Sequence, residues 1–427
     1  MGKPRTRLEQ LATQHGISTS DFVREFTCRA AELGIGIGIS RSAAKRWMQG
    51  GSGEPRVPAR RVLEAWFGEP SAVLFGPPLT DTLAAATEKE LAVNAAHESV
   101  SHALAAASAL DPSALEHLHA AADNAAGAYY VTPPLDMLTD LVVLRDTIYQ
   151  QLDRTHKPLQ QAELYLLAGQ VCGLLSSVTW DLGLGEAAEE QARAAYTYGS
   201  VIDHPSLQAW ARALQVTFAF WSGHPRRAHA LATSALSTAP VGTARARLHS
   251  VNARALALLG ARGEVRSELD SATDELDRSG SDTLLDEVGG ELSFDRARRA
   301  LCAGAAYVAL GDGDQAEHEA SNAVALFGQI PIEQRWALGV LGAQVDLGAA
   351  RTLRGDLAGA QAALLPVFEL PAARRTEAIA LRLHALSRML GTARYRSAVE
   401  ALQLGAAIED FTAVSLSRTT GIRVLPK

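Results

Sequence analysis

A glycine followed five residues later by a small apolar residue recurs through the second half of the chain, and it constrains the fold more than any other feature. The pattern occurs at Gly183/Ala188, Gly223/Ala228, Gly311/Ala316 and Gly355/Ala360, with a relaxed copy at Gly260/Val265. A further small residue follows twelve positions after each glycine: Ala195, Ala235, Ala272, Ala323 and Val367. The copies are irregularly spaced, at intervals of roughly 40 residues.

This pattern predicts helical hairpins, because a helix can end at glycine and small side chains let a second helix pack closely against the first. A single hairpin cannot bury its apolar face, so consecutive hairpins are expected to stack. Ala and Leu dominate a chain that is 47% hydrophobic and 20% charged, and such residues favour helices. We therefore predict an all-α fold with hairpins over residues 169–411, the last of them a capping hairpin over 375–411.

The flanking segments lack this pattern. Between Thr87 and Gln151 we expect three helices, broken at Asp111-Pro112 and Pro133-Pro134 because proline starts or ends helices. Residues 79–168 therefore connect to the hairpins, either as the beginning of the stack or as a separate dimerisation segment. Residues 412–427 are expected to form a tail.

Charge divides the chain into two parts of opposite sign. Residues 1–61 contain 11 Lys and Arg against 5 Asp and Glu, whereas the whole chain contains 40 against 47. Subtraction leaves 29 basic against 42 acidic side chains in residues 62–427. A basic segment joined to an acidic one indicates that residues 1–78 contact a polyanion.

Residues 1–78 are expected to form five helices. The first covers 5–15 and ends at Gly16, and the second covers 20–33, capped by one of Ser18, Thr19 and Ser20. A connector follows in which Ile35, Ile37 and Ile39 alternate with glycine, a brief exception in a chain with almost no period-2 alternation. Ser40 is expected to cap the third helix over 41–49, and the fourth and fifth cover 59–67 and part of 70–76.

The third of these helices has the composition of a helix that reads DNA. Ala43, Ala44 and Trp47 are expected to face inward, which leaves five polar side chains outside: Arg41, Ser42, Lys45, Arg46 and Gln49. Arg and Lys bind guanine or phosphate, Gln binds adenine, and Ser binds either. Four further side chains are expected to contact the DNA backbone: Arg5, Arg7, Arg56 and Arg60. Alternatively, the basic surface only keeps a small helical cap soluble.

At this point the sequence resembles the helix-turn-helix domains of XRE-type regulators, in which the third helix is the reader. The stretch Arg61 to Pro78 is similar to the end of this domain in actinobacterial regulators, RxLExxFGxPxxxLFGPP, and DEVGGELSFDRARRAL at 286–301 is similar to the same family. The connector at 34–39 is longer and richer in glycine than the family's turn. The hairpins resemble degenerate tetratricopeptide repeats (TPR), so the resemblance covers nearly the whole chain.

The TPR resemblance implies a concave groove lined by the first helix of each hairpin. The groove positions correspond here to three aromatic and three basic residues: Trp180, Trp210, Phe220, Arg247, Arg254 and Arg298. Aromatic and guanidinium groups together suit an amphiphilic anion, such as an acidic small molecule or a peptide carboxylate. The alternative is that the aromatic side chains belong to the core and the arginines pair with nearby acids: Asp270, Asp274, Glu275 and Asp277.

No residue constellation indicates catalysis, a metal or a cofactor. The pairs His97/His102 and His117/His119 share a helical face poorly, and no His-Glu-x-x-His motif occurs. Gly34-x-Gly36-x-Gly38 lacks the lysine of a phosphate-binding loop, and Asp312-Gly313-Asp314 is too short for a calcium loop.

Cysteine usage and hydropathy indicate the compartment. Cys28, Cys172 and Cys302 have no partner at a metal-ligand spacing, so we expect buried, reduced thiols. No signal-peptide pattern and no run of about 18 apolar residues is present. A cytoplasmic protein without membrane contact is expected.

These observations favour a homodimeric transcriptional regulator that binds a double-stranded DNA operator. An effector in the groove would select one arrangement of the two DNA-binding domains. The alternative is a TPR adaptor whose DNA-binding domain is non-functional. An enzyme is the third class, and no residues indicate one.

Overall fold

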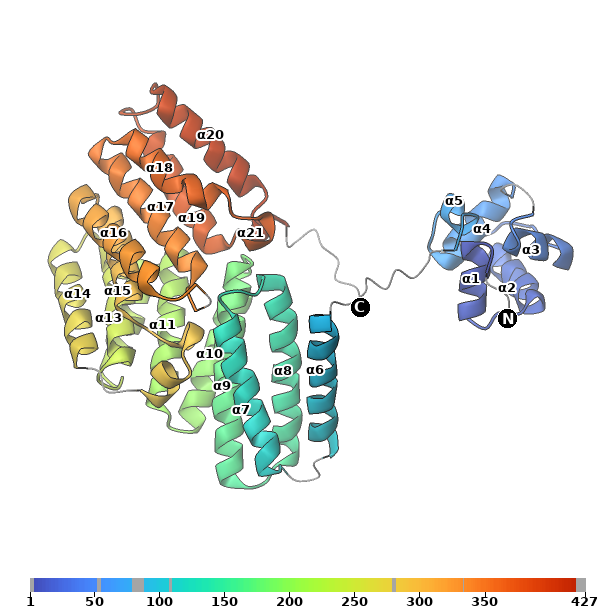
Figure 1. Cartoon of the computed structure of the whole chain (residues 1–427), viewed down its shortest axis with the longest axis horizontal. Coiled ribbons are helices and arrows are strands. Elements are labelled where there is room, and N and C mark those ends of the chain that lie inside the picture. The colour runs from blue at the N-terminus through green and yellow to red at the C-terminus, as the bar shows by residue number, and fades with distance from the viewer. Residues whose placement is uncertain are drawn as a thin grey trace. The chain divides into compact units, whose positions relative to one another are not determined.

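The computed structural model describes residues 4–51, 55–78, 88–106, 110–278, 282–332 and 334–419. These residues form helices and connecting turns with no strand among them, which confirms the all-α prediction. The chain divides into two compact units, residues 1–99 and 100–427, each described below by itself (Figure 1).

The N-terminal unit contains the five expected helices. They are α1 (Arg7–Gln14), α2 (Thr19–Glu32), α3 (Arg41–Met48), α4 (Val57–Phe67) and α5 (Ser71–Leu74). Ser18 caps α2 by accepting a hydrogen bond from the Asp21 amide, and Ser40 caps α3 by accepting from the Ala43 amide. The sequence therefore predicted these helix starts correctly, because the cap side chain satisfies an amide that the helix leaves unpaired.

A compact apolar core holds these helices together. Its fully buried side chains come from all five helices: Leu8, Phe22, Phe26, Ala44, Val62, Leu63 and Leu74. In the connector, Ile35, Ile37 and Ile39 pack against this core while Gly36 and Gly38 are exposed. The alternation seen in the sequence is therefore real, but it belongs to an extended connector rather than to a strand.

The remaining helices begin with α6 (Glu88–Ala106), α7 (Pro112–Ala128) and α8 (Pro134–Arg154). Their boundaries agree with the breaks expected at Pro112 and Pro134. Six helical hairpins follow: α9 (Pro158–Asp181) with α10 (Gly185–Val201), α11 (Pro205–Trp221) with α12 (Pro225–Leu236), α13 (Thr243–Leu258) with α14 (Arg262–Asp277), α15 (Arg296–Ala309) with α16 (Gly313–Gln329), α17 (Ala337–Arg354) with α18 (Leu357–Phe368), and α19 (Glu377–Leu390) with α20 (Val399–Ala413). A last short helix, α21, covers Leu416–Thr419.

The repeated glycines lie where the sequence predicted, between the two helices of the first five hairpins. Their φ angles are all in the left-handed region, from +70° at Gly311 to +92° at Gly355, where a side chain would strain the backbone. The small residues that follow them are buried at the helix crossings: Ala188, Ala195, Ala228, Ala235, Val265, Ala272, Ala316, Ala323, Ala360 and Val367. The pattern therefore predicted both the turn and the packing contact of each hairpin.

The first helices of successive hairpins pack side by side, in the order α9, α11, α13, α15, α17 and α19. Helix α19 also contacts α9, so these six inner helices close into a ring. Figure 1 shows the hairpins following one another from green at α9 to red at α20. The segment between α14 and α15, with the short turns η1 (Thr283–Glu287) and η2 (Gly290–Leu292), contacts α7, α11 and α13.

Helix α9 is the central core helix of this unit. Among the described residues it is the one helix long and apolar enough to cross a membrane, with a mean hydropathy of 1.2 over its most apolar window, but 78% of that window is buried inside the fold. Gly173 of α9 faces the indole of Trp210 so closely that a Cβ atom at Gly173 would overlap the ring. Trp210 has no accessible surface.

The prediction that Trp210 lines a ligand groove is therefore wrong. Its ring fills the gap left by a glycine between α9 and α11, and its Nε1 has no hydrogen-bond partner. This arrangement serves packing rather than ligand binding, because an indole that faces a ligand normally offers its N–H group to a hydrogen-bond acceptor.

Trp210→Ala is expected to destabilise the C-terminal unit by about 3–5 kcal/mol, because it leaves a large cavity that the rigid helices cannot fill. Urea unfolding followed by circular dichroism measures this loss. Leu159→Ala on the same pair of helices is the control, since Leu159 is 82% exposed and should change stability by less than about 0.5 kcal/mol. Equal unfolding midpoints for the two variants would contradict the core assignment.

Candidate functional site

Two places in the structure gather polar side chains where a ligand or partner could bind. The first is the outer face of α3, where Ala44 and Met48 are buried while the five polar side chains are exposed: Arg41, Ser42, Lys45, Arg46 and Gln49. The exposure predicted from the sequence is therefore confirmed for all five. Trp47 is half-buried and packs against Phe26 and Phe75.

Hydrogen bonds from α1 and α2 fix the position of α3. The Thr6 hydroxyl donates to the Met48 carbonyl at 2.6 Å, and the same oxygen accepts from the Glu9 amide as the cap of α1. The Arg41 guanidinium donates to the Ser20 hydroxyl at the start of α2. A helix anchored at both ends presents its outer face as a rigid surface, which recognition of a duplex requires.

The four predicted backbone contacts divide into two groups. Arg5 and Arg56 are exposed, and Arg60 is partly exposed on α4. Arg7 differs, because its guanidinium forms a two-pronged ion pair with Glu69, with a shortest distance of 2.6 Å, and lowers the pKa of that carboxyl. Arg7 therefore ties α1 to the turn after α4, and its contact with phosphate stays a prediction.

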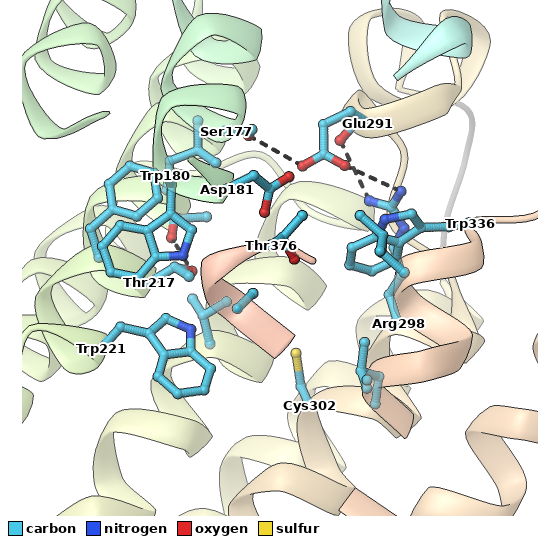
Figure 2. A pocket seen from close by; sticks show the side chains of 18 of the residues that line it. Ser177, Trp180, Asp181, Thr217, Trp221, Glu291, Arg298, Cys302, Trp336 and Thr376 are labelled. Atoms are coloured by element: carbon cyan, nitrogen blue, oxygen red, sulfur yellow. Dashed lines mark hydrogen bonds and ion pairs between the residues drawn. The ribbon is translucent and has the colours of Figure 1, made fainter. Parts of the chain in front are cut away.

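The second place is a cavity of about 170 Å³ inside the ring of inner helices. All six inner helices contribute to its walls. Six aromatic side chains line it: Tyr129, Trp180, Phe218, Trp221, Phe294 and Trp336. Figure 2 shows Trp180 and Trp221 on one side, Arg298 and Trp336 on the other, and Asp181 between them.

The groove residues predicted from the sequence are only partly brought together. Trp180, Arg247, Arg254 and Arg298 line the cavity, whereas Trp210 and Phe220 do not. Phe220 is 4% exposed and packs in the core, with the Arg254 guanidinium 4.5 Å from its ring centroid. Its prediction as a wall residue is wrong because α11 turns its neighbour Trp221 toward the cavity instead.

The alternative pairing of these arginines with nearby acids is not observed. Other arginines take those acids: Arg245 lies 3.9 Å from Glu275, Arg278 lies 3.9 Å from Asp274, and Arg296 pairs with Asp277. The three predicted arginines instead line the cavity, together with a fourth, Arg382.

Two of the cavity arginines hold the segment that precedes α15. Arg247 donates to the carbonyls of Leu292 and Ser293, each at 2.6 Å, and Arg298 donates to the Ser293 carbonyl at 2.6 Å. Glu291 lies 3.7 Å from Arg298 and accepts from the Ser177 hydroxyl at 3.3 Å (Figure 2). These contacts engage the terminal nitrogens of both guanidinium groups within the fold, while the Nε of Arg247 is buried without a partner among the described residues.

Burial and the nearby Arg298 charge lower the pKa of Arg247 to about 10. The guanidinium nevertheless remains protonated at neutral pH. Arg247 and Arg298 are therefore permanent cations with a single carboxylate, Glu291, between them.

The other two cavity arginines form a second cluster. The Arg382 Nε lies 3.3 Å from both carboxylate oxygens of Asp346, and both side chains are nearly inaccessible. The Trp221 ring lies between two guanidinium groups, at 4.8 Å from Arg254 and 5.3 Å from Arg382. Burial, followed by repulsion from Arg382, lowers the pKa of Arg254 to about 10.

The carboxyl group of Asp181, at the cavity wall, is only partly ionised at neutral pH. Burial, together with the nearby Glu291 charge, raises the pKa of Asp181 from 3.8 to about 7. A hydrogen bond that Asp181 accepts from the Tyr129 hydroxyl, at 2.6 Å, acts in the opposite direction and lowers the pKa. Burial likewise raises the pKa of the Cys302 thiol, so this wall residue is uncharged at neutral pH.

Sequence reasoning missed several wall residues. Arg382 and its partner Asp346 were missed because their helices belong to different hairpins, and nothing in the local pattern indicates that α19 returns to α9. Trp221 could have been predicted from the sequence, because it lies at the end of an inner helix, two residues before the repeat glycine Gly223. Cys28 was predicted to be buried but is exposed on α2, while Cys172 and Cys302 are buried.

Asp181→Asn is expected to abolish a fall in stability between pH 4 and pH 7. The carboxyl ionises near 3.8 in the unfolded chain but near 7 in the folded one, so the folded state binds the extra proton and loses stability as the pH rises through this range. At pH 8 the variant should exceed the native protein in unfolding free energy by on the order of 4 kcal/mol. Near pH 3 the two should be equal.

Urea unfolding at a series of pH values measures this difference. Asp153→Asn, at an exposed carboxyl on α8, is the control and should follow the native curve. A pH dependence that persists in Asp181→Asn would mean that another group causes it.

Among the described residues, no three His, Cys, Asp or Glu side chains converge as a metal site. No protein-family model and no curated protein matches the chain. The function must therefore be inferred from the exposed face of α3 and from the cavity.

Proposed function

We propose that this protein is a sequence-specific DNA-binding transcriptional regulator, with an XRE-type helix-turn-helix domain in residues 1–78 and a TPR-like domain that controls it. The observation that carries the proposal is the face of α3. Its five outward polar side chains stand on a helix whose opposite side is anchored in the core.

The chemistry of this face fits a major groove. Arg46 and Lys45 suit guanine edges or phosphates, Gln49 suits adenine, and Ser42 accepts or donates as the base requires. The helix is eight residues long, which is enough for the three or four base-contacting side chains that such motifs use. The positive charge of residues 1–61 supplies the attraction to phosphate that all such proteins need.

The C-terminal unit supplies control in this proposal. Its cavity has aromatic walls and buried arginines, as binding sites for organic anions do. Occupation of the cavity would favour one arrangement of two DNA-binding domains in a homodimer over others, and only one arrangement matches the spacing of the half-sites. A dimer is part of the proposal because one small domain makes too few contacts for specific binding.

Binding of the full chain to a duplex selected from a random library tests the proposal. The logarithm of the affinity should fall linearly with the logarithm of the salt concentration, by about 0.9 for each phosphate contact. Arg56→Ala should make this slope shallower by about 0.9 and leave sequence preference unchanged, because Arg56 is expected to contact phosphate. Arg46→Ala should also relax the preference at one position, at a cost of about 1–3 kcal/mol.

Arg278→Ala is the control for loss of charge, since this exposed arginine belongs to the C-terminal unit. It should leave both the slope and the preference unchanged. Failure to select any duplex, or an affinity that does not depend on salt, would refute DNA binding. That outcome would favour the alternative function, a TPR-like adaptor whose N-terminal domain does not bind DNA.

A further inference from the structure

Arg254 is a buried cation without an acceptor. Its guanidinium is surrounded by protein, lines the cavity and keeps some accessible surface. Its observed contacts are with two aromatic faces, Phe220 at 4.5 Å and Trp221 at 4.8 Å, and among the described residues no hydrogen bond or ion pair is formed by its N–H groups. Stacking on aromatic rings leaves the five N–H donors of a guanidinium unsatisfied.

The charges inside the ring do not balance. Arg247 and Arg298 share Glu291, and Arg254 and Arg382 lie around Asp346, so each cluster holds two guanidinium groups and one carboxylate. The remaining wall carboxyl, Asp181, is partly protonated at neutral pH. Buried charge without a partner costs free energy, and an anion in the cavity would offset that cost.

Arg254 is the cavity arginine best placed to bind the anion. Arg247 and Arg298 donate to backbone carbonyls and Arg382 donates to Asp346, although the Nε of Arg247 has no partner among the described residues. Among these four arginines, Arg254 is the one whose whole guanidinium makes no hydrogen bond or ion pair with the described residues. A planar guanidinium recognises carboxylate with two parallel hydrogen bonds.

The volume of the cavity and its aromatic walls limit the organic group that can carry the anionic charge. The cavity measures about 170 Å³, and an apolar cavity of about 150 Å³ holds one benzene molecule. Trp180 and Phe218 stack at 5.0 Å along one wall, and Trp336 lies on the opposite side from Trp180 (Figure 2). One aromatic ring with a small acidic group fits this space, whereas a peptide of several residues does not.

We infer that the cavity binds a compact aromatic carboxylate, with its carboxylate on Arg254 and its ring among the aromatic walls. This inference names the ligand class for the control site of the proposed function. The inference rests on the proposed function, but ligand binding is measured without DNA. A protein that binds no ligand can therefore be distinguished from one that binds no DNA.

Isothermal titration calorimetry of the full chain with phenylacetate provides the test. Two further compounds, phenylacetamide and acetate, separate the contribution of the aromatic ring to binding from that of the charge. Phenylacetate is expected to bind, the neutral phenylacetamide to bind at least about tenfold more weakly, and acetate to give no measurable heat. The tenfold figure corresponds to the loss of one charge-assisted hydrogen bond. Phenylacetamide that binds as tightly as phenylacetate would overturn the inference, as would a failure of phenylacetate to bind.

Arg254→Met removes the charge and keeps an apolar stem, and it should weaken phenylacetate binding at least about tenfold. Arg212→Met is the matched control, since Arg212 also stacks on an aromatic ring, 3.7 Å from Tyr196, but does not line the cavity. It should bind phenylacetate like the native chain. Equal affinities for the two variants would overturn the assignment of Arg254.

Thermal unfolding without ligand separates binding from folding. Arg254→Met should melt no earlier than the native chain, because it removes an unpaired buried cation. Should it fail to fold, Arg254→Lys keeps the charge but not the two-pronged geometry, and is expected to bind phenylacetate more weakly than the native chain and to retain selectivity over phenylacetamide. Equal binding of phenylacetate and phenylacetamide by Arg254→Lys would overturn the inference.

Discussion

The close packing of α9 against α11 is the contact on which the C-terminal unit depends. Gly173 leaves no side chain where Trp210 inserts its ring, so the two inner helices approach along their length. Small residues act in the same way within the first five hairpins, where a buried alanine or valine lies between the two helices. Because every inner helix is held this closely to the next, six of them complete a ring in which α19 meets α9.

The closed ring of inner helices buries several arginine side chains, and their positive charges need acceptors. Side chains on the inner face are largely shielded from water, so an arginine there is stabilised by an acceptor within the fold or from a ligand. The segment before α15 engages Arg247 and Arg298 with its backbone carbonyls. Asp346 satisfies Arg382. Arg254 is left with aromatic faces alone, and this is why we assign it to a ligand.

Local signals in the sequence predicted most of the fold, because glycine turns and helix caps depend on a few adjacent residues. The starts of α2 and α3 at Ser18 and Ser40 are examples. The cavity was less accessible to prediction. Trp210 and Phe220 were assigned to it wrongly because α11 is apolar on most of its surface, so periodicity does not show which face meets the core. Arg382 and Glu291 were missed because contacts between distant segments place them there.

The central claim is that the exposed face of α3 lies against a DNA duplex, and mapping the protein on the chromosome in living cells tests it most directly. Crosslinking followed by immunoprecipitation and sequencing should recover discrete sites that share a sequence arranged as two half-sites, and Arg46→Ala should lose them while remaining folded. Recovery of DNA without any shared sequence, or an identical map for Arg46→Ala, would contradict the account.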